Sequence, residues 1–430
     1  MSAGIKILAD YRDTWRQTGT GGQAILVGTF AFVTKIVGFS FLLPLYAKAS
    51  GYSTEQYGIL FAMLNIVPVI ALVPILWLAR RGWDRRLMMI GPAMGLVGLL
   101  GLILARDAPF LFWMIAIIPV GGSSATYWTL SDPLLAEATE PHIRGRTYAL
   151  KWILFTLGSS FGALSAGVIP DLFRWATNAN DRNAYWIMLF GLALLDIIQI
   201  RVFRNVPIRD MRSAGRTGQR TVPFRKIGVT LALFGVAEAL FGLGYSTIRP
   251  YMSLFLTERE GLSSGAAGAI LASTAVFAAS GAMLMPVLAQ RIGNTGALAI
   301  LRLGGAVPVA MWFIVGELPA VIAMTFLYYG IMDGTSALYA AEIMGRLPAS
   351  VRDMMAGINN VMWSLVAAVA AALSGYLQDY SNGAFGLAFS VGIAGYVLSA
   401  LWCWRALPGI KIDHLDETPA LGLPHPVTVN

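Results

Sequence analysis

The sequence is poor in cysteine and histidine, and each shortage excludes a class of function. Its 430 residues include one cysteine, Cys403, which excludes an internal disulfide and a cysteine metal cluster. The three histidines, His142, His414 and His425, stand in predicted loops or the tail, and no glycine-rich phosphate loop is present. We therefore expect no enzyme activity, no direct use of ATP, no metal site and no cofactor.

Charge is also scarce. Charged residues make up 13% of the chain and hydrophobic residues 57%, whereas soluble domains carry about 25% charged residues. A water-exposed fold could not bury so large an apolar fraction, so the composition predicts that lipid surrounds most of the chain. Residues 1–22 contain no apolar run of the signal-peptide kind, and we expect no cleaved leader.

Apolar runs long enough to cross a bilayer, about 20 residues each, occur about twelve times. Six precede a basic stretch and six follow it. The sequence therefore predicts an all-α membrane protein of about twelve transmembrane helices in two pseudo-symmetric six-helix halves. The predicted segments are a cytoplasmic N-terminal segment (1–22), an N-terminal half (23–203), a basic linker (204–226), a C-terminal half (227–404) and a cytoplasmic tail (405–430).

Lysine and arginine are distributed unevenly between the loops on the two sides of these runs. With the N-terminus inside, the cytoplasmic segments hold about 21 of them and the outer loops about five. This bias predicts that both termini are cytoplasmic and that the chain lies in a plasma membrane, or an inner membrane if it is bacterial. The basic linker favours contact with the anionic inner leaflet over binding to nucleic acid.

Short polar segments recur about half a chain apart. Residues 51–58 return, much altered, as 261–268, a shift of 261 − 51 = 210, and residues 78–81 return as 288–291 at the same shift. Each copy stands beside a long apolar run, which indicates that the chain was built from two copies of one unit. Repeated halves made of membrane spans are typical of transporters, in which the solute binds where the halves meet.

The loop after the second span resembles a loop motif of the major facilitator superfamily. It reads Leu-Ala-Arg-Arg-Gly-Trp-Asp-Arg-Arg over 78–86, and its second copy reads Leu-Ala-Gln-Arg-Ile-Gly over 288–293. Arg80 stands where the family has an aspartate, and Asp84 offers a substitute acid. The first copy therefore departs further from the family pattern than the second.

The loop after the fourth span, 136–146, resembles the family's acid–proline–Arg-Gly-Arg motif, and 341–352 repeats it after a shift of 342 − 137 = 205. The resemblance covers about 23 to 404. It implies a solute carrier whose two six-helix halves rock around a central cavity. The candidate gating residues in and beside these loops are Arg81, Asp84, Arg85, Asp132, Glu137, Arg144, Arg291, Glu342 and Arg352.

Two ionisable residues stand deep inside predicted spans, where a charge costs at least about 2.5–3.5 kcal/mol and needs a partner or a wet cavity. Lys35 lies about 12 residues from either end of the first span, and Glu238 lies about as deep in the seventh, its counterpart. In the resembled fold both spans line the cavity. We expect the two residues to face it, as a salt bridge or as substrate and proton sites. A structural ion pair within one half is the alternative.

Polar side chains also form stripes on single helical faces. Glu238, Tyr245 and Arg249 are spaced by seven and four residues, which suits a polar or anionic ligand, and the proline that follows predicts a kink. Tyr329 and Asp333 are four apart, and Asp333 either binds a proton or a cationic group or braces its helix. The candidate site also includes Trp128, Asn359, Asn360 and Trp363.

These observations favour a multi-pass secondary transporter that moves a small polar or amphipathic solute by alternating access. Coupling to protons would use Glu238 or Asp333, since protonating a carboxylate changes the local charge. The expected partners are the solute, protons and the lipid bilayer, with no nucleic acid, and we expect a monomer. Two alternatives stay open: a lipid or glycolipid flippase with a cavity open sideways, and a non-transporting scaffold or sensor with a closed cavity.

Overall fold

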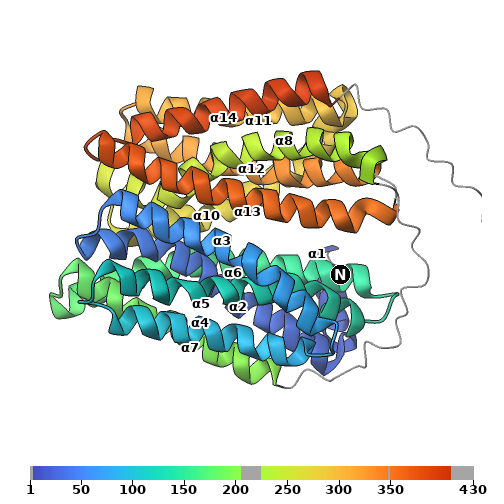
Figure 1. Cartoon of the computed structure of the whole chain (residues 1–430), viewed down its shortest axis with the longest axis horizontal. Helices are drawn as coiled ribbons and strands as arrows, with labels where there is room; N and C mark the ends of the chain where they lie inside the picture. The colour runs from blue at the N-terminus through green and yellow to red at the C-terminus, as the bar shows by residue number, and fades with distance from the viewer. Residues whose placement is uncertain (1–2, 205–223, 347–348, 408–430) are drawn as a thin grey trace, which may run out of the picture.

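The computed structural model of the chain describes residues 3–204, 224–346 and 349–407, and over these it contains helices and no strand (Figure 1). A short helix, α1 (Ala3–Gln17), precedes the first half. The long helices of this half are α2 (Gly19–Ala49), α3 (Thr54–Ala79), α4 (Asp84–Leu104), α5 (Phe110–Glu137), α6 (Arg144–Thr177) and α7 (Asp181–Phe203).

The second half repeats this arrangement with one interruption. The helix α8 (Phe224–Ile248) is followed by the 3₁₀ turn η2 (Arg249–Tyr251), the short α9 (Met252–Leu254) and the π-helical turn η3 (Phe255–Arg259). Pro250 cannot donate the hydrogen bond that an α-helix needs, so the regular helix ends beside it, as the sequence predicts. The remaining helices are α10 (Ser264–Ile292), α11 (Asn294–Ile314), α12 (Leu318–Arg346), α13 (Ala349–Tyr380) and α14 (Phe385–Ala406).

The helices match the membrane prediction. Ten helical segments within the described residues are long and apolar enough to cross a membrane. With α8 and α12, of 25 and 29 residues, they account for the twelve predicted spans. Large apolar side chains such as Val73, Leu104 and Met283 are exposed on the outer surface, where lipid would cover them.

Figure 1 shows the two halves as separate layers, with α2 to α7 in one and α8 to α14 in the other. Small residues let the helices of each half approach closely. A Cβ added to Gly162 would lie 2.5 Å from the Thr34 carbonyl oxygen, and one added to Gly395 would lie 2.7 Å from the Gly244 nitrogen. Most of the predicted linker, and the predicted tail beyond residue 407, lie outside the described residues.

Candidate functional site

A cavity of about 250 Å³ lies between the two halves. Helices α2, α3 and α6 line it from the first half, and the stretch from α8 to α10, with α12 and α13, lines it from the second. The first half contributes hydroxyl, amide and phenyl groups to this lining, and the second contributes hydroxyl groups, aromatic rings and one charged group. The chief polar and aromatic lining residues are Ser40, Asn65, Ser159 and Ser160 in the first half and Tyr245, Arg249, Tyr329 and Trp363 in the second.

Arg249 is the charged residue of this lining, and Asp333 of α12 holds its guanidinium group. Arg249 Nη1 lies 2.5 Å from Asp333 Oδ1, and Nη2 lies 3.3 Å from Oδ2. The guanidinium carbon lies 4.7 Å from the ring centre of Tyr245 and 4.6 Å from that of Tyr329, within cation–π range. Trp363 of α13 packs edge-on against Tyr245 at 5.1 Å. Both side chains of the ion pair are 30% exposed, so the pair is not sealed in the protein interior.

The break after α8 positions this arginine. The 3₁₀ turn at η2 leaves the Pro250 carbonyl outside the α-helical pattern, and the hydroxyl of Tyr57 in α3 donates to it at 2.9 Å. The Tyr251 hydroxyl donates to the Ala371 carbonyl of α13 at 2.6 Å. The backbone that carries Arg249 is therefore tied to both halves of the molecule.

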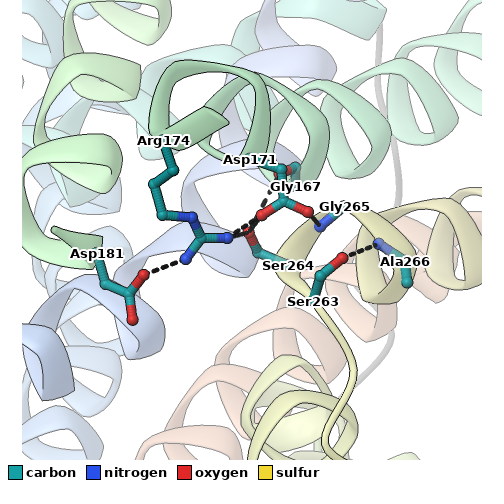
Figure 2. Close-up of polar contacts among 8 residues, drawn as sticks. All are labelled: Gly167, Asp171, Arg174, Asp181, Ser263, Ser264, Gly265 and Ala266. Atoms are coloured by element: carbon teal, nitrogen blue, oxygen red, sulfur yellow. Dashed lines mark hydrogen bonds and ion pairs between the residues drawn. The ribbon is translucent and has the colours of Figure 1, made fainter. Parts of the chain in front are cut away.

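The two halves are joined at the end opposite the basic loops 80–86 and 138–146, which we call the distal end. Figure 2 shows Asp171 of α6 accepting hydrogen bonds from the Ser264 hydroxyl at 2.6 Å and from the Gly265 N–H at 2.7 Å. Arg174 donates to Asp171 and Asp181, and to the Ser264 hydroxyl at 3.0 Å. A carboxylate of the first half thus caps the N-terminus of α10 in the second.

The second half makes the equivalent contact with the first half. Asp379 of α13 accepts hydrogen bonds from the N–H groups of Thr54 and Glu55, at 3.0 and 2.8 Å, at the N-terminus of α3. Asp171 and Asp379 are separated by 379 − 171 = 208 residues, close to the shift of the repeat. We call these two contacts the reciprocal caps. Each caps one copy of the repeated segment that the sequence shows at 51–58 and 261–268.

Close backbone approach supports this distal closure. A Cβ added to Gly167 of α6 would lie 2.2 Å from the Ser264 carbonyl oxygen, and one added to Gly58 of α3 would lie 2.8 Å from that of Ala371. A side chain at either position would push the halves apart. On both flanks of the cavity, α6 therefore meets α10 and α3 meets α13 with almost no space between their backbones.

A family model of the Major Facilitator Superfamily matches residues 25–371. The chain belongs to this superfamily. Membership confirms the resemblance that the loop motifs show and accounts for the two six-helix halves around one cavity. It also identifies the chain as a multi-pass membrane protein of a transporter family.

Solved structures share the superfamily fold at low identity. The nucleoside transporter NupG has a TM-score of 0.72 at 13% identity, over 91% of this chain and 100% of that one. A D-xylose–proton symporter has a TM-score of 0.69 at 15% identity, over 92% and 98%. A bacterial homologue of the human lysosomal transporter Spinster has a TM-score of 0.67 at 15% identity, over 90% and 95%.

An uncharacterised membrane protein of Saccharomyces cerevisiae is 24% identical over 150 residues. This match covers 34% of the present chain and 33% of the yeast protein. The chain therefore matches about a third of the length of this curated relative.

Superfamily membership leaves open which residues form the site, and the structure corrects one prediction. Lys35 and Glu238 do not form a salt bridge with each other. Lys35 Nζ lies 2.6 Å from Asp196 Oδ1 in α7, and Glu238 Oε2 lies 2.9 Å from Arg302 Nη2 in α11. Both residues are at most 5% exposed and neither is in the cavity lining. A charge at this depth pairs with the nearest neighbouring helix of its own half, which is the alternative considered above.

Other predicted site residues do come together. Tyr245 and Arg249 from the end of α8, Tyr329 and Asp333 from α12, and Trp363 from α13 form one contiguous cluster. The four-residue spacings in the sequence placed each pair on one helical face, and the fold brings the two faces into contact. We call these five residues the arginine cluster.

The remaining binding candidates lie outside the cavity lining. Trp128 is 49% exposed and packs against Phe32 and Tyr127 in the first half. The Asn359 side-chain oxygen is buried without a hydrogen-bond partner, and Asn360 is exposed. Their part in binding stays a prediction.

Several predicted gating residues make contacts inside their own half. Asp132 pairs with Lys151 at 2.5 Å, and Arg144 donates to the Ala136 carbonyl at 2.9 Å. The Glu342 carboxylate accepts from Thr295 at 2.9 Å. These contacts attach the loops to helices of the same half, which suits halves that move as units.

The loop after α3 is held in the same way. Arg81 stacks 3.6 Å over the Trp77 ring, and Arg85 donates to the Arg204 carbonyl. Asp84 is buried at the start of α4, and among the described residues its Oδ1 has no hydrogen-bond partner and its carboxylate no ion pair with an arginine. Glu137 has a partner and Arg291 is exposed, whereas the Arg352 side chain lies outside the described residues.

The sequence analysis missed the reciprocal caps, although Asp171 and Asp379 stand at nearly the repeat shift. This near-repeat spacing of the two aspartates, together with the two serine-containing helix starts at 51–58 and 261–268, could have predicted the caps. Within the described ranges, no group of three or more His, Cys, Asp or Glu side chains could hold a metal ion.

Proposed function

We propose that this superfamily member is a secondary transporter that moves a small polar or amphipathic solute by alternating access, coupled to protons. The observation that carries the proposal is the cavity of about 250 Å³ between the halves, whose lining includes serine hydroxyl groups of the first half and Tyr245, Arg249, Tyr329 and Trp363 of the second. Sites between repeated halves are where such transporters bind their solutes. The solved transporters with the same fold, for nucleosides and for xylose with protons, support the same class of solute.

The closed distal end corresponds to one stage of the alternating-access transport cycle. The described hydrogen bonds between the halves lie between the level of Ser160 and the distal end. At Ser160 the hydroxyl donates to the Ala272 carbonyl. If the basic loops face the cytoplasm, as their charge predicts, the structure is the state closed to the outside. Opening of the reciprocal caps would then expose the cavity to the other side of the membrane.

Asp333 is the proposed coupling residue. Its side chain is 30% exposed and pairs with an arginine in the cavity wall. Glu238 is 5% exposed and pairs with Arg302 inside the second half. Neither carboxylate is in the cavity lining, but Asp333 is the more exposed of the two and bonds directly to Arg249 of the lining, which favours Asp333 as the proton site.

The alternatives are less well supported. A lipid flippase needs a cavity open sideways, whereas α3 with α13 and α6 with α10 pack closely on its two flanks. A scaffold would bury Lys35 and Glu238, as observed, but would not need a cavity between the halves with an arginine in its lining.

Purified chain in liposomes that enclose a pH-sensitive dye would test the proposal. A panel of polar solutes that includes uridine and D-xylose is added outside, and the internal pH is followed. We expect at least one solute to drive proton movement in the wild type and not in Asp333→Asn. The matched variant Glu238→Gln combined with Arg302→Met leaves no buried charge without a counterion and should keep that response. No solute uptake and no proton movement across the whole panel would overturn the proposal.

A further inference from the structure

The cavity presents one cation and no free anion among its lining residues. Arg249 is the charged member of the lining. The other buried charges near the centre of each half are paired internally, Lys35 with Asp196 and Glu238 with Arg302. The first-half wall offers neutral donors, such as Asn65. The electrostatic potential that a solute meets in the cavity is therefore set by Arg249 and by the protonation state of its partner.

A second group beside Arg249 is ready to bind a ligand. Ser253 lines the cavity four residues further along the chain and is 3% exposed. Its hydroxyl oxygen is buried and has no hydrogen-bond partner in the described part of the molecule. Buried hydroxyl groups are normally paired, because an unpaired one costs free energy. An oxygen of a bound solute would satisfy it while also reaching the guanidinium group.

Asp333 occupies the position on Arg249 that a solute carboxylate would need. Its two oxygens lie 2.5 and 3.3 Å from the two terminal nitrogens of the guanidinium group, the forked geometry that arginine offers to any carboxylate. While Asp333 is ionised the pair is neutral and the site needs no anion. Protonation of Asp333 would leave the charge of Arg249 without a counterion.

Among the side chains that the structure describes, the groups named below around Asp333 add no charge beyond that of Arg249. Arg249 of η2 bonds to Asp333 and contacts Tyr245 of α8, and on the helix of Asp333 itself Tyr329 and Tyr328 lie nearby. The hydroxyls of Tyr328 and Tyr396 share a hydrogen bond of 2.7 Å, so α14 also presents a neutral group. From α10 and α13 the cavity receives neutral side chains such as Thr274 and Trp363. Titration of Asp333 would therefore control the net charge of the arginine cluster.

The aromatic members of the cavity define the remainder of the solute. The rings of Tyr245, Tyr329 and Trp363 lie beside Arg249, and Phe61 of α3 faces them from the first half. Such rings suit an apolar group attached to a charged one. The volume of about 250 Å³ limits the solute to a small molecule.

We propose that the substrate is a small organic monocarboxylate, and that it takes the place of Asp333 on Arg249 when Asp333 binds a proton. This inference rests on the proposed function and narrows it to one substrate class. One proton from the aqueous phase forms an O–H bond with the Asp333 carboxylate, and one solute carboxylate, whose own covalent bonds do not change, moves onto Arg249 and the Ser253 hydroxyl. Proton and monoanion together carry no net charge, so their joint movement is electrically silent.

Binding to the purified full chain tests the substrate class without requiring transport. The probes are matched acid and amide pairs: lactate with lactamide, benzoate with benzamide, and indole-3-acetate with indole-3-acetamide. Thermal stabilisation is measured at about pH 6 and about pH 8, where carboxylic acids with a pKa near 4 stay ionised. We expect at least one acid to stabilise the wild type, at least about tenfold more tightly at the lower pH, while its amide does not.

Variants separate the proposed exchange from a structural role of the ion pair. Asp333→Asn, which resembles the protonated side chain, should bind the acid equally well at both pH values. Arg249→Gln combined with Asp333→Asn leaves no unpaired charge and should lose acid binding. Arg12→Gln, at a side chain of α1 that is 66% exposed, is the matched control and should behave as the wild type.

The outcomes are distinguishable from failure of the proposed function. Equal stabilisation by acid and amide, stabilisation by no acid, or loss of pH dependence in the wild type would each overturn the monocarboxylate. If the liposomes still couple protons to uridine or xylose, the proposed function stands and this inference fails. If an acid binds as expected but neither acid nor protons cross the liposome membrane, the proposed function fails instead.

Discussion

The two halves of the molecule agree at the distal end and differ at the cavity. At the distal end each half supplies an aspartate, Asp171 or Asp379, that caps a helix of the other. At the cavity the second half supplies Arg249, the charged residue of the lining, whereas the lining residues of the first half are all neutral. A closing contact works equally well from either side, so both copies keep it. A binding site for one asymmetric solute needs different groups on its two walls.

The buried ion pairs show a third relation between the halves. In α2 the buried charge is Lys35, and in its counterpart α8 it is Glu238. Their partners, Asp196 of α7 and Arg302 of α11, have the opposite signs. In each half the buried charge must be neutralised by a partner, and this works whether the first residue is the cation or the anion.

The largest effect is expected from breaking one of these pairs. Lys35→Met would leave Asp196 buried without a counterion and lower the free energy of unfolding by about 3–5 kcal/mol. Lys35→Met combined with Asp196→Leu should recover most of that loss, because no buried charge is left. Unfolding in detergent, followed by circular dichroism, measures both. If the double variant is as unstable as the single one, the ion pair stabilises the fold by more than cancelling a buried charge.

The cavity walls provide the next prediction. Arg249→Gln should lower solute uptake into liposomes at least about tenfold, since a hydrogen bond to a charged group contributes about 1.5–3 kcal/mol. Ser40→Ala, on the opposite wall, removes one neutral hydroxyl and should lower uptake only a few-fold. Equal losses of uptake in the two variants would show that the two cavity walls contribute equally to solute binding.

The reciprocal caps should respond equally to equal changes. Asp171→Asn and Asp379→Asn each weaken a charged helix cap, worth about 0.5–2 kcal/mol, and should shift the population toward the state open at the distal end. Cysteines introduced across the distal end would cross-link less readily in each variant, and least in the double variant. A large effect from one aspartate and none from the other would show that only one half closes the cavity.

The smallest effect is expected at the distal rim. Lys48 and Glu258 form an ion pair whose side chains are 48% and 31% exposed. Exposed pairs contribute about 0–1 kcal/mol, so Lys48→Gln should leave the same cross-linking almost unchanged. If Lys48→Gln lowers cross-linking as much as the cap variants do, this ion pair also closes the distal end.

Some of the site could be predicted because its spacing is local. Tyr245 with Arg249, and Tyr329 with Asp333, are four residues apart, and helical geometry alone places each pair on one face. The sequence could not show that the two faces meet, because α8 and α12 are far apart in the chain. It also could not choose the partner of Lys35, since Glu238 and Asp196 both lie deep in predicted spans and only packing decides which carboxylate is within reach.

By itself the sequence determined the membrane solvent, the spans, the duplication and the family, since these depend on composition and on motifs that are read locally. Only the tertiary structure decided that the repeated segments are helix starts capped from the opposite half, and that Arg249 rather than Lys35 lines the cavity. Those outcomes depend on which helices touch, and contacts between distant segments are settled by close packing of small residues and by the requirement that every buried charge be neutralised.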